Sequence, residues 1–366
     1  MDCPIADAES MQTTHYRHYF SIKFIVFGFL VILLGFAVLG LHAQSDVPLT
    51  LVRDVTASAT TSGAEKDLLF AVDPLVFNEV WAYLMYNEER FIPVQAGISD
   101  LAYFSARIST QGKLFGVPDI KRLEGVPGRK HLVVAEVSNQ AILHFVLNPA
   151  YPLRDILIAD IVQAARPYDG VNIDFEMLPL ADKANFMEFL RLLRTALPGK
   201  ILSVCVPART RLMQDAYNYR EIAAVVDRIL VMAYDEHWSG SAAGPVASMN
   251  WTRRVATWAL ENIPAEKLIM GMPFYGRAWG NTNPAGAYKH SSISRMIDEK
   301  QVLPDRTDEG IPTFFFSETI TYTVFYDDSQ SLYTRAAQYK NLGTKNIGFW
   351  RLGQEDPLVW SLLLLE

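Results

Sequence analysis

The chain has 366 residues, 50% of them apolar, and a formal net charge of −7. The apolar content is enough for a large core, and the length allows one large domain or two modest ones. There is no run of lysine and arginine, which argues against a nucleic-acid partner. The two cysteines, Cys3 and Cys205, form no cluster with metal-ligand spacing, so we expect neither a metal site nor a disulfide.

Residues 1–43 are predicted to be a signal peptide or a membrane anchor rather than part of the fold. Phe24 to Leu41 contains no charged residue, and Arg17 and Lys23 precede it. The run is longer than a usual signal core of about 7–15 residues and near the lower limit of about 17 for a span, so both alternatives stay open. Either one implies export. The acidic opening is unusual for a signal sequence and makes Met11 a candidate start.

Residues 44–78 are expected to be a linker, and a regular alternation of strand-like and helix-like runs begins at residue 79. Strand-like runs are predicted at Val80–Tyr86, Leu101–Ile108, His131–Val137, Gly170–Phe175, Ile201–Pro207, Arg228–Tyr234, Leu268–Tyr275 and Asn346–Trp350. The clearest helix-like runs are Ala181–Leu197, Ser331–Asn341 and Pro357–Leu365. This order predicts an α/β fold, a (β/α)8 TIM barrel over residues 79–366.

Residues 278–327, between the seventh strand and its helix, exceed what the barrel needs. They contain a helix-like piece near Ser292–Lys300 and strand-like pieces at Thr313–Phe316 and Thr321–Tyr326. We therefore expect a small α+β insertion on the rim of the barrel.

The stretch Tyr168–Glu176 has the pattern of a strand with two different faces. Val171, Ile173 and Phe175 point to one side, and Asn172, Asp174 and Glu176 point to the other. In a parallel sheet covered on both faces, such a polar row would be buried at a cost of several kcal/mol per unpaired charge. The row is therefore predicted to be the active site.

Asp174 and Glu176 lie roughly 6.6 Å apart along the predicted strand, at its carboxyl end. Two carboxyls this close do not both ionise freely, so the pKa of one should rise. A glutamic acid that stays protonated near neutral pH can act as a general acid. Paired carboxyls of this kind suit glycoside cleavage, in which the leaving oxygen must be protonated.

Several segments together resemble glycoside hydrolase family 18, the chitinase-like hydrolases. Asp169–Glu176 is similar to the family signature, and Val231–Asp235, Gly271–Arg277 and Trp350 resemble further family segments in the same order. Tyr234–Trp238 and Trp350–Gln354 are most similar to bacterial spore-cortex-type N-acetylglucosaminidases. Those enzymes usually carry LysM repeats, and this sequence contains none.

The resemblance implies a retaining, substrate-assisted mechanism without metal or organic cofactor. Glu176 would protonate the glycosidic oxygen, and the 2-acetamido carbonyl of the substrate would be the nucleophile. Asp174 would orient the acetamido group, and Tyr234 would hold its carbonyl. Many family members have aspartate where this chain has Asn172, which is expected still to hydrogen-bond Asp174 but to alter the pH profile.

The resemblance also implies substrate contacts for a wider set of residues: Asn172, Met232, Asp235, Tyr275, Arg277, Trp350 and Tyr83. Asp235 and Arg277 could equally form an internal salt bridge, and Met232 and Trp350 could be plain core. His237 is expected to be a scaffold residue, and Trp238 and Trp279 are candidate sugar-stacking platforms.

These features predict an exported, monomeric hydrolase of β-1,4-linked N-acetylglucosamine glycans. Its partner would be a peptidoglycan-type or chitin-like glycan, with peptidoglycan fragments the first expectation. The alternative is a non-catalytic, chitinase-like glycan-binding protein.

Overall fold

The computed structural model describes residues 73–93, 96–281, 285–318 and 321–365. The predicted signal or anchor segment, residues 1–43, lies outside these residues, as does most of the expected linker. Within the described part of the chain, no helix combines the length and the apolar character that crossing a bilayer requires.

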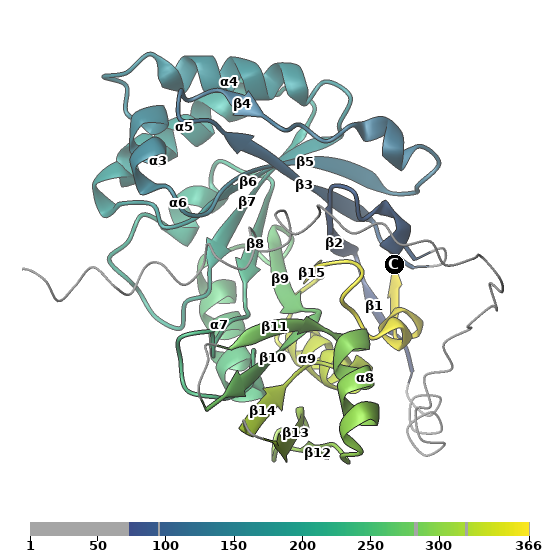
Figure 1. Ribbon diagram of the computed structural model, residues 1–366. Coiled ribbons are helices and arrows are strands. Elements are labelled where there is room, and N and C mark those ends of the chain that lie inside the picture. Colours follow the sequence, from purple (N-terminus) through teal and green to yellow (C-terminus); the bar gives the residue numbers. More distant parts are fainter. Residues whose placement is uncertain (1–72, 94–95, 282–284, 319–320, 366) are drawn as a thin grey trace, which may run out of the picture. The chain divides into compact units, whose positions relative to one another are not determined.

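Among the described residues, eight parallel strands close into a barrel (Figure 1). They are β2 (Glu79–Met85), β3 (Asp100–Ile108), β5 (Arg129–Glu136), β6 (Gly170–Phe175), β7 (Ile201–Pro207), β8 (Arg228–Met232), β9 (Leu268–Pro273) and β15 (Asn346–Trp350). The barrel closes because β15 pairs with both β9 and β2, and β2 pairs with β3. A short antiparallel strand, β4 (Leu114–Phe115), extends β3. The predicted TIM barrel is confirmed.

Helices cover the outside of the barrel. They are α3 (Gln140–Leu147), α4 (Leu153–Ala164), α5 (Lys183–Ala196), α6 (Tyr219–Ala223), α7 (Met249–Asn262) and α9 (Ser329–Asn341). The connections around β2 and β3 instead carry the 3-10 turns η1 (Glu89–Phe91) and η2 (Ile120–Leu123). Helix α5 buries the apolar stripe that predicted it, and the turn η3 (Leu180–Asp182) precedes it. A capping box of Asp328 and Ser331 fixes the start of α9.

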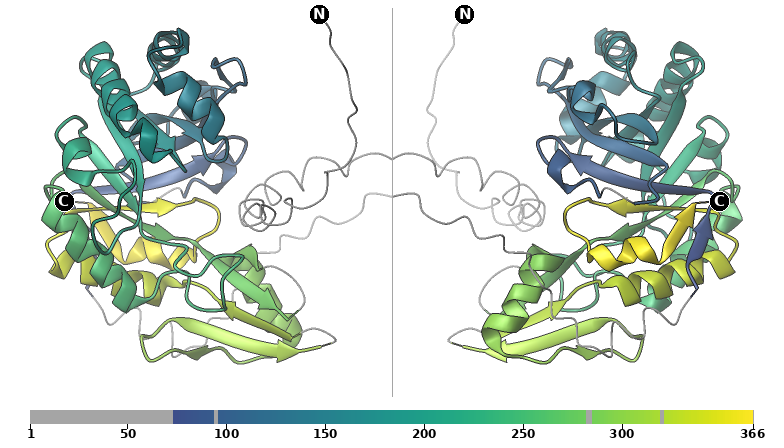
Figure 2. Two further views of the ribbon diagram at one scale, coloured as in Figure 1. Left: turned by 90° about the vertical axis from the view of Figure 1, so that its left-hand side faces the viewer. Right: turned by 90° about the vertical axis from the view of Figure 1, so that its right-hand side faces the viewer.

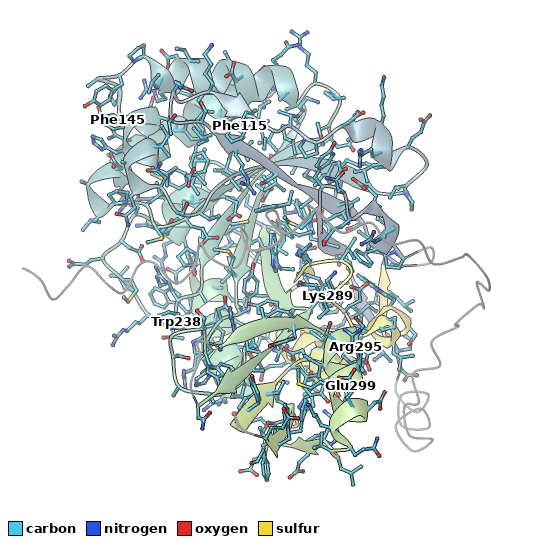
Figure 3. All side chains as sticks on the ribbon, in the orientation of Figure 1. Phe115, Phe145, Trp238, Lys289, Arg295 and Glu299 are labelled. Carbon is cyan, nitrogen blue, oxygen red and sulfur yellow. The ribbon has the colours of Figure 1, made fainter. Side chains whose placement is uncertain are left out.

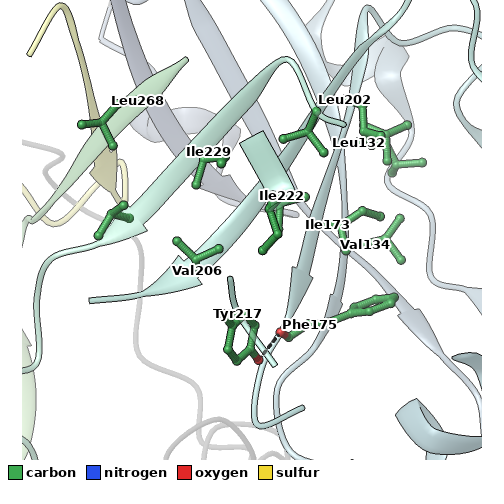
Figure 4. Close-up of a cluster of buried hydrophobic side chains, with 14 of the residues drawn as sticks. Leu132, Val134, Ile173, Phe175, Leu202, Val206, Tyr217, Ile222, Ile229 and Leu268 are labelled. Atoms are coloured by element: carbon green, nitrogen blue, oxygen red, sulfur yellow. Dashed lines mark hydrogen bonds between the residues drawn. The ribbon is translucent and has the colours of Figure 1, made fainter. Parts of the chain in front are cut away.

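The alternation of side chains along each strand divides the core into two layers. Outward residues such as Val171, Ile173 and Phe175 join the large cluster between strands and helices, part of which Figure 4 shows. Inward residues such as Trp81 and Phe104 form a second cluster inside the barrel. Every polar side chain that points inward from a strand therefore meets this lumen and the groups that line it.

A network of charged side chains fills the amino end of the barrel. The Arg129 guanidinium donates to Asp100 and Glu79, Arg228 donates to Glu79, and His131 Nε2 lies 2.7 Å from Asp100 Oδ1. Burial works against ionisation of Glu79, but hydrogen bonds from Arg228 and other donors keep its pKa below the ordinary value. This end of a barrel contributes to stability, and the carboxyl ends of the strands are where chemistry is expected.

A five-stranded antiparallel sheet and one helix follow β9 and project at the lower edge of Figure 1. The sheet contains β10 (Tyr275–Gly280), β11 (Gly286–Lys289), β12 (Asp305–Arg306), β13 (Pro312–Ser317) and β14 (Thr321–Phe325), and the helix is α8 (His290–Lys300). Figure 2 shows this unit from both sides, and in Figure 3 Lys289 marks the end of β11. The sheet starts at Tyr275, which had been expected to end the seventh barrel strand.

The prediction of a C-terminal helix over Pro357–Leu365 is wrong. Pro357–Ser361 is a 3-10 turn, η4, and Leu363–Leu365 is a strand, β16, that pairs in parallel with β1 (Leu75–Phe77). The Asp356 side chain caps this turn by accepting a hydrogen bond from Leu358 N. The backbone groups beyond Leu362 pair with a distant strand, so the helix does not continue. That strand, β1, lies inside the stretch expected to be a linker.

Candidate active site

Strand β6 carries the two central carboxyls to the open end of the barrel. Because Phe175 is held in the outer core, Asp174 points into the lumen, where the residue is only 5% exposed. Glu176 lies just past the strand, but its N–H still donates to Glu136 O at the end of β5, 2.9 Å away. Met177 then takes a left-handed conformation (φ 55°), which turns the chain away.

Two hydrogen bonds of the Tyr217 hydroxyl hold the loop after β6. Its hydroxyl donates to Phe175 O at 2.7 Å, the bond drawn in Figure 4, and accepts from Leu178 N at 3.2 Å. These two bonds flank Glu176 on both sides in the sequence. The glutamate therefore sits on a braced backbone rather than on a free loop.

Burial changes the protonation of both carboxyls. It raises the pKa of Asp174 to about 6, against which a hydrogen bond from the Cys205 side chain acts. Burial raises the pKa of Glu176 to about 8, and the charges of Asp174 and Asp235 add to this effect. The expected rise of one carboxyl pKa is thus present, with Glu176 the group that keeps its proton near neutral pH.

Asn172 lies beneath Asp174 and has no exposed surface. Its Oδ1 accepts from the Tyr83 hydroxyl at 3.1 Å and from the Cys205 thiol at 3.3 Å, and its Nδ2 donates to Ser203 Oγ at 2.9 Å. The hydrogen bond expected between Asn172 and Asp174 is not among those of the described residues. The amide is turned toward β2 and β7 instead, because those strands supply the partners.

Tyr234 and Asp235 follow β8, which is separated from β6, the strand of Asn172, only by β7. The ring centroid of Tyr234 lies 6.4 Å from that of Tyr275, and burial raises the pKa of its hydroxyl well above the ordinary value. Asp235 Oδ1 accepts from the Tyr275 hydroxyl at 2.6 Å and from Arg277 Nη2 at 2.8 Å. Asp235 and Arg277 form the internal salt bridge that is one of the two roles expected of them. The Asp235 carboxylate thereby places a negative charge near Glu176.

Trp350, at the end of β15, lies over the aromatic lining of the lumen. Its ring centroid is 5.3 Å from Tyr83 and 4.8 Å from Phe104, and Met232 packs against the same cluster. Trp350 and Met232 are only partly buried, unlike the residues below them. The predicted set thus gathers at one end of the barrel, with Tyr83 and Asn172 buried under it.

The aromatic residues expected to stack on sugars differ from one another. Trp279 has only 9% exposure and packs against Phe325 across the β10–β14 pair, so in this conformation it is core. Trp238, labelled in Figure 3, is partly exposed and stays a candidate. His237 Nδ1 lies 2.8 Å from Pro245 O, a loop-bracing contact of the kind expected of a scaffold residue.

Sequence reasoning missed three residues that shape the site: Cys205, Ser203 and Tyr217. The first two could have been found from the alternation along Ile201–Pro207, which points them to the same side. Among the described residues there is no group of three or more His, Cys, Asp or Glu side chains placed to hold a metal.

Comparisons with known proteins agree on one family and one fold. The family model for glycosyl hydrolases family 18 matches residues 153–355. The putative sporulation-specific glycosylase YdhD of Bacillus subtilis is 29% identical over 343 residues, 85% of this chain and 80% of that protein. The cortical fragment-lytic enzyme of Bacillus anthracis is 26% identical over 287 residues, covering 72% of this chain and 67% of that enzyme.

Solved structures share the barrel fold of this chain. The spore cortex-lytic enzyme SleL of Bacillus cereus superposes with a TM-score of 0.72 at 22% identity, over 81% of this chain and 76% of that one. A chitinase of Chromobacterium violaceum superposes with a TM-score of 0.69 at 26% identity, over 78% of this chain and 97% of that one.

Proposed function

The chain belongs to glycosyl hydrolases family 18 and is a glycoside hydrolase; from this premise we propose that it cleaves β-1,4-linked N-acetylglucosamine glycans with retention of configuration. Glu176 is the general acid and base of the proposed reaction. The observation that carries the proposal is the pairing of the buried Asp174 with the partly buried Glu176 at the open end of the barrel, with the glutamate pKa raised to about 8.

In the first step Glu176 gives its proton to the glycosidic oxygen as the bond to the anomeric carbon breaks. The acetamido carbonyl oxygen of the substrate attacks that carbon, so the nucleophile belongs to the substrate. Asp174 accepts a hydrogen bond from the acetamido N–H and stabilises the developing positive charge. Its Oδ1 is suited to this, being buried and without a hydrogen-bond partner among the described residues.

Tyr234 donates its hydroxyl to the acetamido carbonyl oxygen. Its raised pKa keeps it protonated over the whole working range, as a donor must be. In the second step Glu176, now ionised, takes a proton from the incoming water, whose oxygen attacks the anomeric carbon while the bond from that carbon to the acetamido oxygen breaks and the acetamido group is restored. The product keeps its configuration, and Glu176 regains its proton.

Peptidoglycan fragments are the first proposed substrate, because the relatives include enzymes named for spore cortex lysis, and chitooligosaccharides are the second. Product analysis by mass spectrometry on both materials would identify the glycan and the mode of attack. Proton NMR of the first-formed anomer would test retention.

The decisive variant is Glu176→Gln, which keeps the shape of the side chain but cannot donate the proton. We expect turnover to fall by about 10²–10⁴-fold while substrate still binds. Glu188→Gln on α5 is the matched control, because Glu188 is 47% exposed on the outer surface. Wild-type turnover by Glu176→Gln would refute the assignment, and binding without turnover by the unmodified chain would favour a glycan-binding protein.

We also propose that the protein is exported, either secreted or anchored by the apolar segment 24–41, and that it is a monomer. Cell fractionation of the full chain would test the first point, and light scattering of the purified protein the second. Purely cytoplasmic protein, or a stable dimer, would contradict these proposals.

A further inference from the structure

Positively charged side chains gather at the rim of the barrel, where β2 and β15 end. Arg90 lies in the turn η1, which follows β2, and Arg351 directly follows Trp350 at the end of β15. Lys289, labelled in Figure 3, is the last residue of β11 in the inserted sheet. Three segments that are far apart in the sequence thus contribute one cation each.

The ring of Phe91 holds two of these cations close together. Its centroid lies 4.4 Å from Lys289 Nζ and 4.9 Å from Arg90 Cζ. The ring packs directly on Gly353 (φ 82°), where an added Cβ atom would come within 2.4 Å of it, so a larger residue would displace the ring. Arg90 is exposed and the Lys289 side chain is 33% exposed, so a ligand can reach both.

The loop after β15 joins this cluster to the proposed site. Leu352 N donates to Tyr83 O at 2.8 Å, and His290 N donates to Gln354 O at 3.0 Å. The loop is therefore held between β2 and the inserted unit, directly after Trp350. A glycan that lies over Trp350 and extends toward β2 brings a neighbouring sugar to the cluster.

The cations of the cluster share a single ion-pair partner. Arg351 forms an ion pair with Glu88, and Lys289 Nζ lies 3.9 Å from the other oxygen of the same carboxylate. Among the residues that the structure describes, no carboxylate forms an ion pair with Arg90. Glu88 alone therefore does not balance the three positive charges.

Two further carboxyls nearby do not remove this excess. Glu89 accepts a hydrogen bond from the Tyr103 hydroxyl, and burial raises the pKa of Glu355. Burial lowers the pKa of Lys289, and the charge of Arg90 adds to this effect while that of Glu355 opposes it. A carboxylate of a bound ligand would relieve the repulsion between the two cations and receive charge-assisted hydrogen bonds from both.

We propose that Arg90 and Lys289 bind a carboxylate of the glycan and so select muramic-acid-type sugars over neutral chitin-type sugars. A muramic acid residue carries a lactyl carboxylate, or a stem peptide with carboxylates of its own, whereas chitin carries no anionic group. The inference rests on the proposed function and decides between its two substrates. Charged groups at the rim of a binding site contribute chiefly to the choice between ligands.

The test compares two tetrasaccharides of alternating N-acetylglucosamine and N-acetylmuramic acid. One has free lactyl carboxylates, and in the other those carboxyls are converted to methylamides. We expect the wild-type kcat/KM to be about five- to tenfold higher for the free carboxylate at low salt, and this ratio to fall as salt is added. In the double variant Arg90→Gln/Lys289→Gln the ratio should fall to about one.

A third tetrasaccharide, whose lactyl groups carry stem peptides, distinguishes the two sources of the carboxylate. If it alone is preferred over the methylamide, the peptide supplies the anion; preference for the free lactyl form assigns the anion to the sugar. If neither is preferred by the wild type, the proposal is overturned.

Two single variants separate the site from the overall charge of the protein. Lys289→Arg keeps the cation and should keep the preference. Arg191→Gln removes a cation that is 56% exposed on α5, outside the barrel, and should leave the ratio unchanged. Equal ratios in the wild type and the double variant, or an equal loss in Arg191→Gln, would contradict a site at Arg90 and Lys289.

A second readout does not depend on turnover. In the Glu176→Gln background, titration calorimetry measures the dissociation constants of the free and methylamide tetrasaccharides with and without the double substitution. The preference for the free carboxylate should be present with Arg90 and Lys289 and absent without them. If the wild type cleaves none of these glycans while this binding preference is present, only the proposed hydrolysis is refuted. Equal dissociation constants in an otherwise active enzyme would refute only the carboxylate site.

Discussion

Replacing the proposed catalytic acid should make the protein more stable at alkaline pH. Glu176 has a raised pKa in the folded chain, which means that the folded chain holds this proton more tightly than the unfolded chain does. The stabilisation is complete below the unfolded pKa of about 4.5 and is lost as pH rises through about 8. In Glu176→Gln the side chain is neutral at every pH, so this loss should disappear.

The size of the effect follows from the two pKa values. The difference between the ordinary value of 4.5 and about 8 corresponds to roughly 5 kcal/mol at about 1.36 kcal/mol per pKa unit. Rearrangement around a buried charge reduces this figure. Because pH 5 already lies above the unfolded pKa, we expect the variant to gain about 2–4 kcal/mol over the wild type at pH 9, relative to the difference at pH 5.

Urea unfolding followed by tryptophan fluorescence at pH 5, 7 and 9 measures this gain. Glu188→Gln should show no comparable pH-dependent difference, because about half of that side chain is exposed and water screens its charge. If the wild type and Glu176→Gln differ by the same free energy at pH 5 and pH 9, the reasoning about burial is wrong.

Three further variants test separate parts of the structure. Tyr234→Phe should lower kcat by about 10²-fold with an unchanged circular dichroism spectrum, because it removes one donor to the acetamido oxygen; an unchanged kcat would exclude that contact. Arg277→Leu leaves the Asp235 carboxylate without its cation, and we expect a loss of about 1–3 kcal/mol in urea unfolding together with a lower kcat/KM. Arg335→Met removes the partner of Asp327 from a site where both side chains are at most 2% exposed. The free energy of unfolding should therefore fall by about 3–5 kcal/mol. Wild-type stability would show that the pair is dispensable.

The barrel and its central pair could be predicted because their signals are local. Outward apolar residues alternate with inward polar ones along β6, and this period of two is visible in the sequence without any knowledge of neighbours. The same holds for α5, whose apolar stripe repeats with the period of a helix.

The parts that could not be predicted depend on contacts between distant segments. The partner of Asn172 was misjudged because Ser203 and Tyr83 reach it only through the register of β7 and β2. The end of the chain was misread as a helix because its pairing partner, β1 at Leu75–Phe77, is far from it in the sequence. Leucine-rich runs have good helix propensity, and a distant strand can override it.

The closure of the barrel has a consequence for the order in which the protein matures. Strand β15 lies between β9 and β2, so the first and last barrel strands meet only when the C-terminal part of the chain is available. Tyr83 and Trp350, which meet at the proposed site, come from these two strands. During synthesis, a ribosome-bound chain that has not yet released residue 350 holds an open sheet with no complete site. Pairing between segments that are far apart in the sequence must therefore come before the site is complete.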